Sequence, residues 1–287
     1  MSPRSPGTDL LAPAHLRATR LRELGLAHVA RGEYRLARSP LRRALAIARR
    51  ALPPSEVALA LNALGVLDKY TARFAEAGRV YREALAIKRR ERPRDPEALA
   101  SLLHNLGGLE HARGRYAAAE PFAREAVRLR RRALGADHLD VAIDEVALAA
   151  VLEARGALAE SARLHARAIR SLQRARAAKG KGARARAEAE LGIALAGLAV
   201  VEYRRERHTA SARAFQRALA LQERTLGDAH PDVGITLANL AVVREAQDRP
   251  AVALALAVRA RRILERSLGR AHPETRACIA IAKRLEG

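Results

Sequence analysis

Apolar residues recur along this chain in six clusters, spaced by about forty residues. Each cluster is centred on a leucine with apolar residues three positions before and after it, except that Glu145 occupies one of the earlier positions. Such spacing puts the side chains on one face of an α-helix, so each cluster predicts an amphipathic helix, here named an A helix. Successive central leucines lie 40, 42, 42, 50 and 42 residues apart: Leu24, Leu64, Leu106, Leu148, Leu198 and Leu240.

A second helix, here named the B helix, is predicted to follow each A helix. Three clusters carry a glycine eight residues after the leucine (Gly32, Gly114 and Gly156), where a left-handed residue closes a helix. The residue at position +17 is predicted to be buried: Leu41, Tyr81, Ala123, His165, Phe215 and Ala257. An alanine at +20 in every cluster indicates two helices crossing closely: Ala44, Ala84, Ala126, Ala168, Ala218 and Ala260. The chain is therefore predicted to be all-α, with six helix pairs that stack and form an extended binding surface.

Three segments depart from the repeated pattern. Residues 1–13, which contain three prolines, are expected to form a disordered N-terminal tail. Residues 176–183 contain two glycines and no apolar residue larger than alanine, which predicts a loop or hinge; a longer, frayed B helix is the alternative. Residues 272–287 carry one more apolar stripe and are predicted as a C-terminal capping helix. The repeats then occupy about residues 14–53, 54–95, 96–137, 138–175, 184–229 and 230–271.

The connections between helix pairs carry a more specific signature. Residues 226–232 are Leu-Gly-Asp-Ala-His-Pro-Asp, and related runs occupy residues 134–140 and 268–274. With Leu-x-Asn-Leu-Gly/Ala in the A helices, these runs resemble the tetratricopeptide repeat (TPR) family, in the 42-residue variety of kinesin light chains and many bacterial proteins. The resemblance covers roughly residue 14 to the C-terminus. It implies a right-handed α-α superhelix (TPR solenoid) that acts as a protein-interaction scaffold.

Charge and composition narrow the possible partners. The chain has 53 basic and 31 acidic residues, a formal charge of +22, and all but five of the basic residues are arginines. This field attracts acidic partners and polyanions, although genome composition also produces an arginine bias. The lone Cys278 excludes an internal disulfide and a multi-cysteine zinc site, and a cytoplasmic location is expected. No apolar run approaches the length of about 18 residues that a membrane span needs.

The resemblance also implies which side chains face a ligand, because A helices line the concave groove of such stacks. The implied groove positions hold Arg22, Asn62, Lys69, Tyr70, Ser101, His104, Asn105, His111, Tyr203, Arg204, Asn239 and Glu245. An asparagine amide offers donors and an acceptor to a peptide backbone. Bonds between neighbouring A helices are the alternative role for these asparagines. A convincing Lys/Arg and Asn set for clamping a C-terminal carboxylate is missing.

The fourth repeat presents an apolar groove surface beside the polar third one. Its groove positions hold Ile143, Val146, Ala150 and Ala154. A polar patch next to an apolar one suits an amphipathic or extended peptide. The chain's own tail is the alternative occupant.

Metal binding and catalysis find little support in the residues. His138, His230 and His272 recur once per repeat, about 20 Å apart by helix stacking, so they are interpreted as turn residues. His104 and His111 lie seven residues apart and lack the i, i+4 spacing of zinc ligands. Asp144 and Glu145 are interpreted as solvated or helix-start charges. No nucleophile or phosphate-loop motif occurs, so neither an enzyme nor a cofactor is predicted.

Arginine clusters fall on the B helices, mostly near their ends, where positive charge favours the helix dipole: residues 42–43, 49–50, 89–90, 130–132 and 261–262. Nucleic acid is the less favoured partner because few aromatic side chains remain to stack on bases. We expect a scaffold that binds a peptide or partner helix in its groove. The alternatives are anion or nucleic-acid binding by the arginine-rich outer face, and regulation of a catalytic or signalling partner on another chain.

Overall fold

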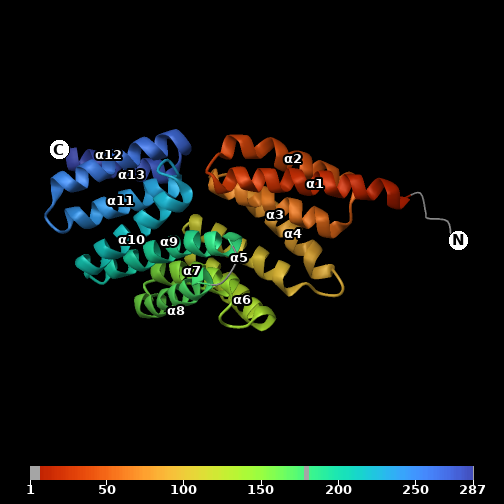
Figure 1. Cartoon of the computed structure of the whole chain (residues 1–287), viewed down its shortest axis with the longest axis horizontal. Coiled ribbons are helices and arrows are strands. Elements are labelled where there is room, and N and C mark those ends of the chain that lie inside the picture. Colours follow the sequence, from red (N-terminus) through yellow and green to blue (C-terminus); the bar gives the residue numbers. More distant parts are fainter. Residues whose placement is uncertain (1–6, 178–180, 287) are drawn as a thin grey trace. The chain divides into compact units, whose positions relative to one another are not determined.

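The computed structural model describes residues 7–177 and 181–286, and every regular element in these two stretches is an α-helix (Figure 1). The predicted all-α class of paired helices is confirmed. Odd-numbered helices are the A helices of the sequence pattern and even-numbered ones are the B helices. In chain order they are α1 (Gly7–Ala30), α2 (Tyr34–Ala51), α3 (Pro54–Tyr70), α4 (Phe74–Arg90), α5 (Pro96–Ala112), α6 (Tyr116–Leu134), α7 (Leu139–Ala154), α8 (Leu158–Ala177), α9 (Lys181–Arg204), α10 (His208–Leu226), α11 (Pro231–Glu245), α12 (Pro250–Ser267) and α13 (Pro273–Glu286).

The helices belong to two compact units, each considered by itself. The first unit ends at Arg113 and contains α1–α5; the second begins at Gly114 and contains α6–α13. In the first unit α1 packs on α2 and α3 on α4, and each of these B helices also meets the next A helix. In the second unit the pairs are α7 with α8, α9 with α10, and α11 with α12. Each unit thus contains consecutive helix pairs, the arrangement of stacked repeats, while α5 ends the first unit and α6 begins the second.

Burial follows the repeated apolar pattern in most repeats, although the central Leu24 of the first repeat is 48% exposed. In α3, Leu61 and Leu67 are completely buried and Leu64 is 8% exposed, so the stripe spaced by three residues faces the interior. The alanines at position +20 are at most 1% exposed in all six repeats. A larger side chain at these positions would have to displace a neighbouring helix, because protein interiors are close-packed.

The turn between the A and B helices keeps one backbone conformation whether or not glycine is present. Gly32, Gly114 and Gly156 have φ values of 71°, 73° and 84°. The equivalent residues of the other three repeats are not glycine, yet they adopt the same left-handed region, with φ of 56°, 61° and 57°: Ala72, Glu206 and Asp248. Packing of the helix pair therefore imposes the turn, at the cost of some backbone strain in the repeats without glycine.

The recurring histidines, which the sequence indicated as turn residues, cap the helices that follow them. His138 Nδ1 accepts a hydrogen bond from the backbone N–H of Asp140 at 3.2 Å, at the start of α7. In the same way, the Nδ1 atoms of His230 and His272 each accept a hydrogen bond of 3.2 Å from the backbone N–H of the residue two positions later. These contacts lie at the starts of α11 and α13. A side chain that accepts a bond from an otherwise unpaired N–H stabilises a helix N-terminus. Within residues 7–177 and 181–286, no group of three or more His, Cys, Asp or Glu side chains is arranged to hold a metal ion.

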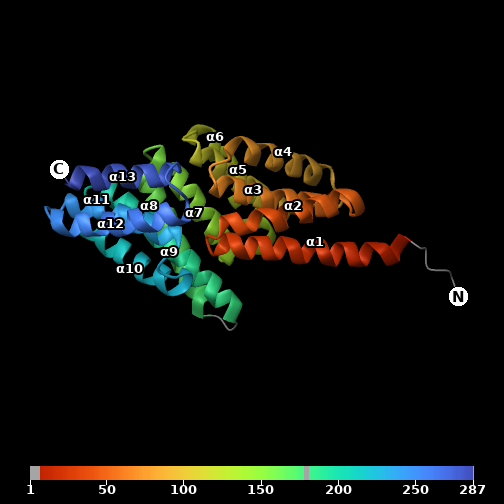
Figure 2. The ribbon, with the colours of Figure 1, turned by 90° about the horizontal axis from the view of Figure 1, so that it is seen from above.

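The last helix, α13, covers the end of the second unit. It lies along α11 and α12, as Figure 2 shows. Cys278 and Ala282 are at most 1% exposed, and Ala282 packs against Ala241, Ala253 and Ala257. The helix therefore closes an apolar face that the last repeat would otherwise expose.

Three helices, α1, α8 and α9, extend further than the sequence pattern indicated. The tail was expected to reach residue 13, but α1 begins at Gly7; residues 1–6 lie outside the described part of the chain. The loop expected at 176–183 is flanked by α8, which continues to Ala177, and α9, which begins at Lys181, while residues 178–180 are not described. Alanine and arginine dominate both flanks, and these residues have high intrinsic helix propensity without needing an apolar stripe.

Candidate functional site

The sequence-predicted groove residues are divided between the two units. Eight of them lie on the A helices α1, α3 and α5 of the first unit, and none of these eight is buried: Arg22, Asn62, Lys69, Tyr70, Ser101, His104, Asn105 and His111. This surface is called the A-helix face. Helix α3 packs beside both α1 and α5, so these eight residues lie on adjacent helices. The remaining four residues, Tyr203, Arg204, Asn239 and Glu245, lie on α9 and α11 of the second unit.

Two asparagines join neighbouring helices at the centre of the A-helix face. Asn105 Nδ2 on α5 donates a hydrogen bond to Asn62 Oδ1 on α3 at 2.8 Å. This contact is the structural role that the sequence offered as the alternative to ligand binding. It uses one donor of Asn105 and the oxygen of Asn62, which leaves the Asn105 oxygen and the Asn62 amino group as further hydrogen-bonding groups. The bond also fixes both side chains in one orientation.

An aromatic and cationic group lies at the C-terminal end of α3. The Tyr70 ring stacks on Tyr34 with ring centroids 5.7 Å apart and an interplanar angle of 11°. The ammonium group of Lys69 lies 4.7 Å from the centre of the Tyr70 ring. Tyr70 is 39% exposed and is the one aromatic residue classed as exposed among those the structure describes. Its ring is therefore a rigid, accessible contact surface.

Other predicted groove residues are engaged within the fold. Arg22 Nη1 lies 3.3 Å from Glu56 Oε2, which ties α1 to α3. The Ser101 hydroxyl donates to the Glu97 carbonyl oxygen of its own helix at 3.0 Å. Both His104 and His111 are half-buried, and each has interactions of its own. These four side chains are therefore already engaged in contacts within the fold.

In the second unit, the predicted residues mainly connect helices. Arg204 Nη1 on α9 pairs with Glu153 Oε1 on α7 at 2.6 Å. Glu245 on α11 accepts two bonds from Arg284 on α13, at 3.0 and 2.6 Å. The Tyr203 ring lies 5.3 Å from that of His208, and Asn239 is half-buried. The Arg284–Glu245 contact is bidentate, a geometry typical of strong arginine–carboxylate pairs, whereas Arg204 uses a single nitrogen.

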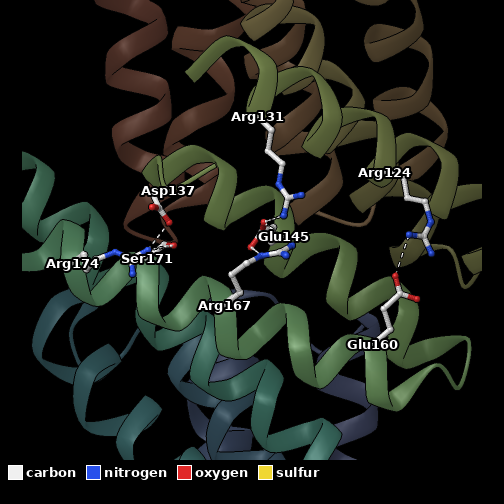
Figure 3. Close-up of polar contacts among 8 residues, drawn as sticks. All are labelled: Arg124, Arg131, Asp137, Glu145, Glu160, Arg167, Ser171 and Arg174. Carbon is white, nitrogen blue, oxygen red and sulfur yellow. Dashed lines mark hydrogen bonds and ion pairs between the residues drawn. The ribbon is translucent and has the colours of Figure 1, made fainter. Parts of the chain in front are cut away.

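The carboxylates of Asp144 and Glu145 on α7 are buried, which corrects their interpretation as solvated charges. Both are 1% exposed. Arg130 Nε on α6 donates to Asp144 Oδ2 at 2.7 Å. Glu145 is held from two sides, by Arg131 of α6 and by Arg167 of α8, whose Nη2 lies 2.8 Å from Glu145 Oε1 (Figure 3). Buried carboxylates require such partners because an unpaired charge is strongly unfavourable in the interior.

Side chains of α6 and α8, with one from α7, line an open pocket of about 570 Å³, and the two arginines that hold Glu145 belong to this lining. Three apolar side chains, Val127, Leu148 and Leu164, form its floor and are 4–8% exposed. Arginines dominate its rim, where a single glutamate is present: Arg124, Arg128, Arg131, Arg132, Glu160, Arg163 and Arg167. This cavity is called the α6–α8 pocket. An apolar floor with converging charged groups is the usual composition of a ligand site.

Carboxylates neutralise only part of this rim. Arg124 Nη1 spans the pocket to Glu160 Oε1 at 3.1 Å, a contact that Figure 3 shows between α6 and α8. Arg128 donates to Glu125 at 2.6 Å and thereby lowers the pKa of that carboxyl. Arg132 and Arg163 are exposed, and neither forms a hydrogen bond or ion pair with any residue that the structure describes. The rim therefore carries excess positive charge.

A second pocket of about 400 Å³ lies between α2 and α4 in the first unit. Its lining uses the same repeat positions, since Leu45, Leu64 and Val80 correspond to Val127, Leu148 and Leu164. Three of its five lining arginines pair with carboxylates, whereas Arg42 and Arg79 form no hydrogen bond or ion pair with the residues that the structure describes. Arg38 pairs with Asp68 at 2.9 Å, Arg73 with Glu76 at 2.8 Å and Arg49 with Glu83 at 2.6 Å. Glu83 occupies the repeat position of Arg167, so the two pockets differ in charge at a shared site.

Sequence comparison assigns the repeats to a family. Tetratricopeptide repeat profiles match residues 17–55, 99–140 and 190–266, which together make up more than half of the chain. The chain belongs to the tetratricopeptide repeat family. No curated protein sequence matches it.

Solved structures share the fold of this TPR protein at low sequence identity. BtubC (BKLC) from P. vanneervenii is 21% identical, with a TM-score of 0.56, covering 94% of this chain and 95% of that one. NprR in complex with its cognate peptide NprX is 12% identical, with a TM-score of 0.67 and coverages of 96% and 72%. The apo form of RapI is 11% identical, with a TM-score of 0.58 and coverages of 94% and 98%. At such low identities, the TM-scores show a common fold and no more.

The arginine pockets of this TPR protein were missed by sequence reasoning. Their arginines appeared as clusters near B-helix ends, and the helix dipole explained them without a pocket. A usable signal was present, because Arg42 and Arg124 share one repeat position, and so do Arg79 and Arg163. Comparing the charge at each repeat position shows the shared arginines.

None of the helices within the described stretches is both long and apolar enough to cross a bilayer.

Proposed function

We propose that this TPR protein is a protein-interaction module that binds an extended peptide or partner helix on the A-helix face of its first unit. The observation that carries the proposal is the Asn62–Asn105 bond at 2.8 Å, which holds two amides at the centre of a face flanked by Tyr70 and Lys69. Because the amides are already ordered, binding does not have to immobilise them.

The chemistry of the face suits a peptide main chain. The Asn105 oxygen can accept from a peptide N–H, while the Asn62 amino group can donate to a peptide carbonyl. The Tyr70 ring provides apolar contact area at low entropic cost, and it is exposed where α3 ends. This combination gives orientation from hydrogen bonds and affinity from an aromatic contact.

Comparison supports a peptide as the occupant. The NprR structure contains its cognate peptide and has a TM-score of 0.67 with this chain. At 12% identity the likeness concerns the fold. A TPR stack of similar backbone geometry therefore accommodates a peptide, which makes a peptide or helix the natural ligand class for this chain.

The net charge of +22 favours an acidic partner, which includes a catalytic or signalling protein that this chain would regulate. Nucleic acid is less favoured, since Tyr70 is the one exposed aromatic among the described residues and base stacking needs several. The apolar positions of α7 suit a second anchor for a partner in the other unit. Val146 there is 8% exposed and packs with Leu191 and Leu195 of α9, so the neighbouring helix already covers part of that surface.

Site-specific photo-cross-linking tests the proposal. A photoreactive amino acid at Tyr70 should cross-link a partner from cell extract, and the adduct should be lost in Asn62→Ala/Asn105→Ala. Removing both amides leaves no unpaired buried group, so the double variant should retain its helicity by circular dichroism. The matched control carries the photoreactive residue at Leu36, which is 59% exposed on the B helix α2. Identical adducts from both positions, or an adduct that persists in the double variant, would disprove binding on the A-helix face.

A further inference from the structure

We propose that the α6–α8 pocket is a second binding site, for an acidic peptide segment that inserts one apolar side chain between its carboxylates. The pocket lies on B helices of the second unit, whereas the proposed peptide site uses A helices of the first unit. The inference is therefore independent of the A-helix face.

The floor and the rim select different parts of such a ligand. Val127, Leu148 and Leu164 line the floor of a cavity of about 570 Å³, a size within the range of about 300–1,000 Å³ for small ligand sites. An apolar side chain of a ligand that enters this cavity buries its own surface and that of the three lining side chains, which favours binding. Arg132 and Arg163 stand on opposite helices of the rim, so they reach carboxylates on either side of the inserted residue.

The buried Glu145 orients the rim. It is 1% exposed and is shared by Arg131 from α6 and Arg167 from α8, which holds both guanidinium groups at the pocket (Figure 3). One carboxylate thus serves two arginines, and positive charge remains for a ligand. A site whose charged groups are fixed before binding spends less entropy on forming the complex.

The α2–α4 pocket provides an internal comparison. It has the same three apolar positions, but Asp68 and Glu76 line it and Glu83 reaches Arg49 at 2.6 Å. In the fourth repeat, Arg167 occupies the repeat position of Glu83, and Leu152 occupies that of Asp68. The lining of the α6–α8 pocket therefore carries more net positive charge, with six arginines and one carboxylate, against five arginines and two carboxylates in the α2–α4 pocket.

The pocket favours a peptide over nucleic acid. No aromatic side chain from the described part of the chain lines it, so bases have nothing to stack on. Its apolar floor matches a feature that a peptide has and a phosphate backbone lacks. Phosphate binding would also depend on net positive charge rather than on these particular arginines.

Fluorescence anisotropy with defined peptides and the full chain tests the proposal. The probe is a short glutamate-rich peptide with one central leucine; a second peptide has glutamine in place of the leucine. We expect Arg132→Glu/Arg163→Glu to weaken binding of the leucine peptide by about tenfold or more. The glutamine peptide should bind the wild-type chain several-fold more weakly, because it leaves the apolar floor unfilled.

Arg170→Glu/Arg217→Glu is the matched control, since it makes the same change in net charge at exposed positions outside the pocket. It should change the affinity less than about twofold, and so should Arg42→Glu/Arg79→Glu in the α2–α4 pocket. Unchanged helicity of all variants shows that folding is intact. Equal losses in all three variants would overturn the proposal. So would equal affinity for the two peptides, or single-stranded DNA that binds with the same dependence on Arg132 and Arg163.

Discussion

Acidification is expected to destabilise this TPR protein through one buried histidine. His165 on α8 is 1% exposed, and neither ring nitrogen has a hydrogen-bond partner among the residues that the structure describes. Its ring lies directly against Gly197 on α9, where an added Cβ would come within 2.4 Å of His165 Cε1. Burial lowers the pKa of His165 from 6.5 to about 4, because the imidazolium would have to give up its hydration.

The sign and size of the effect follow from that pKa shift. The folded-state pKa is below the unfolded one, so the unfolded chain takes up the proton first and stability falls as the pH drops from about 6.5 towards 4. Between about pH 7.5 and pH 5 the proton binding of the unfolded state lowers the free energy of unfolding by about 2 kcal/mol. A loss of this size is large against a typical stability of about 5–15 kcal/mol.

Urea unfolding followed by far-ultraviolet circular dichroism measures this loss across the pH range. His165→Leu is the matched variant, because leucine occupies the equivalent position in the first repeat as the buried Leu41. The leucine variant should lose about 2 kcal/mol less than the wild type over the same range, since it cannot take up a proton there. Parallel pH profiles for the two proteins would refute the argument, because acidic groups common to both would then account for the whole effect.

Three further substitutions test other parts of the fold. Ala168→Leu should lower the free energy of unfolding by about 1–3 kcal/mol in urea melts, because Ala168 is fully buried in the core of the second unit; an unchanged midpoint would contradict the close crossing. Ala72→Gly should raise it by up to about 1 kcal/mol by relieving a φ of 56°, and a clear loss would show that the turn is unstrained. Glu145→Gln should lower it by about 1–3 kcal/mol, because Arg131 and Arg167 lose their shared charged acceptor, with Glu160→Gln on the exposed rim as the milder control.

Much of the fold was readable from the sequence because it depends on local geometry. A spacing of three residues places side chains on one helix face wherever it occurs, and alanine at position +20 permits a close helix crossing. The repeat also predicted the helix-capping histidines, such as His138, from their place in the connecting turns. The A-helix face was identified only through the family resemblance, and it remains a prediction. The starts of α1 and α9 could not be predicted from the apolar pattern, because both helices begin well before the leucine-centred stripe that the pattern marks.

Only the tertiary structure decided how charged side chains are paired. Asp144 and Glu145 look like surface residues in the sequence, yet arginines from α6 and α8 enclose Glu145 and make its burial tolerable. The same is true of the α6–α8 pocket, where Arg132 and Arg163 come from different helices. Helical periodicity is a property of neighbouring residues, so a sequence determines it directly. Arginine side chains are long and flexible, and which carboxylate each one meets depends on how the repeats pack in space.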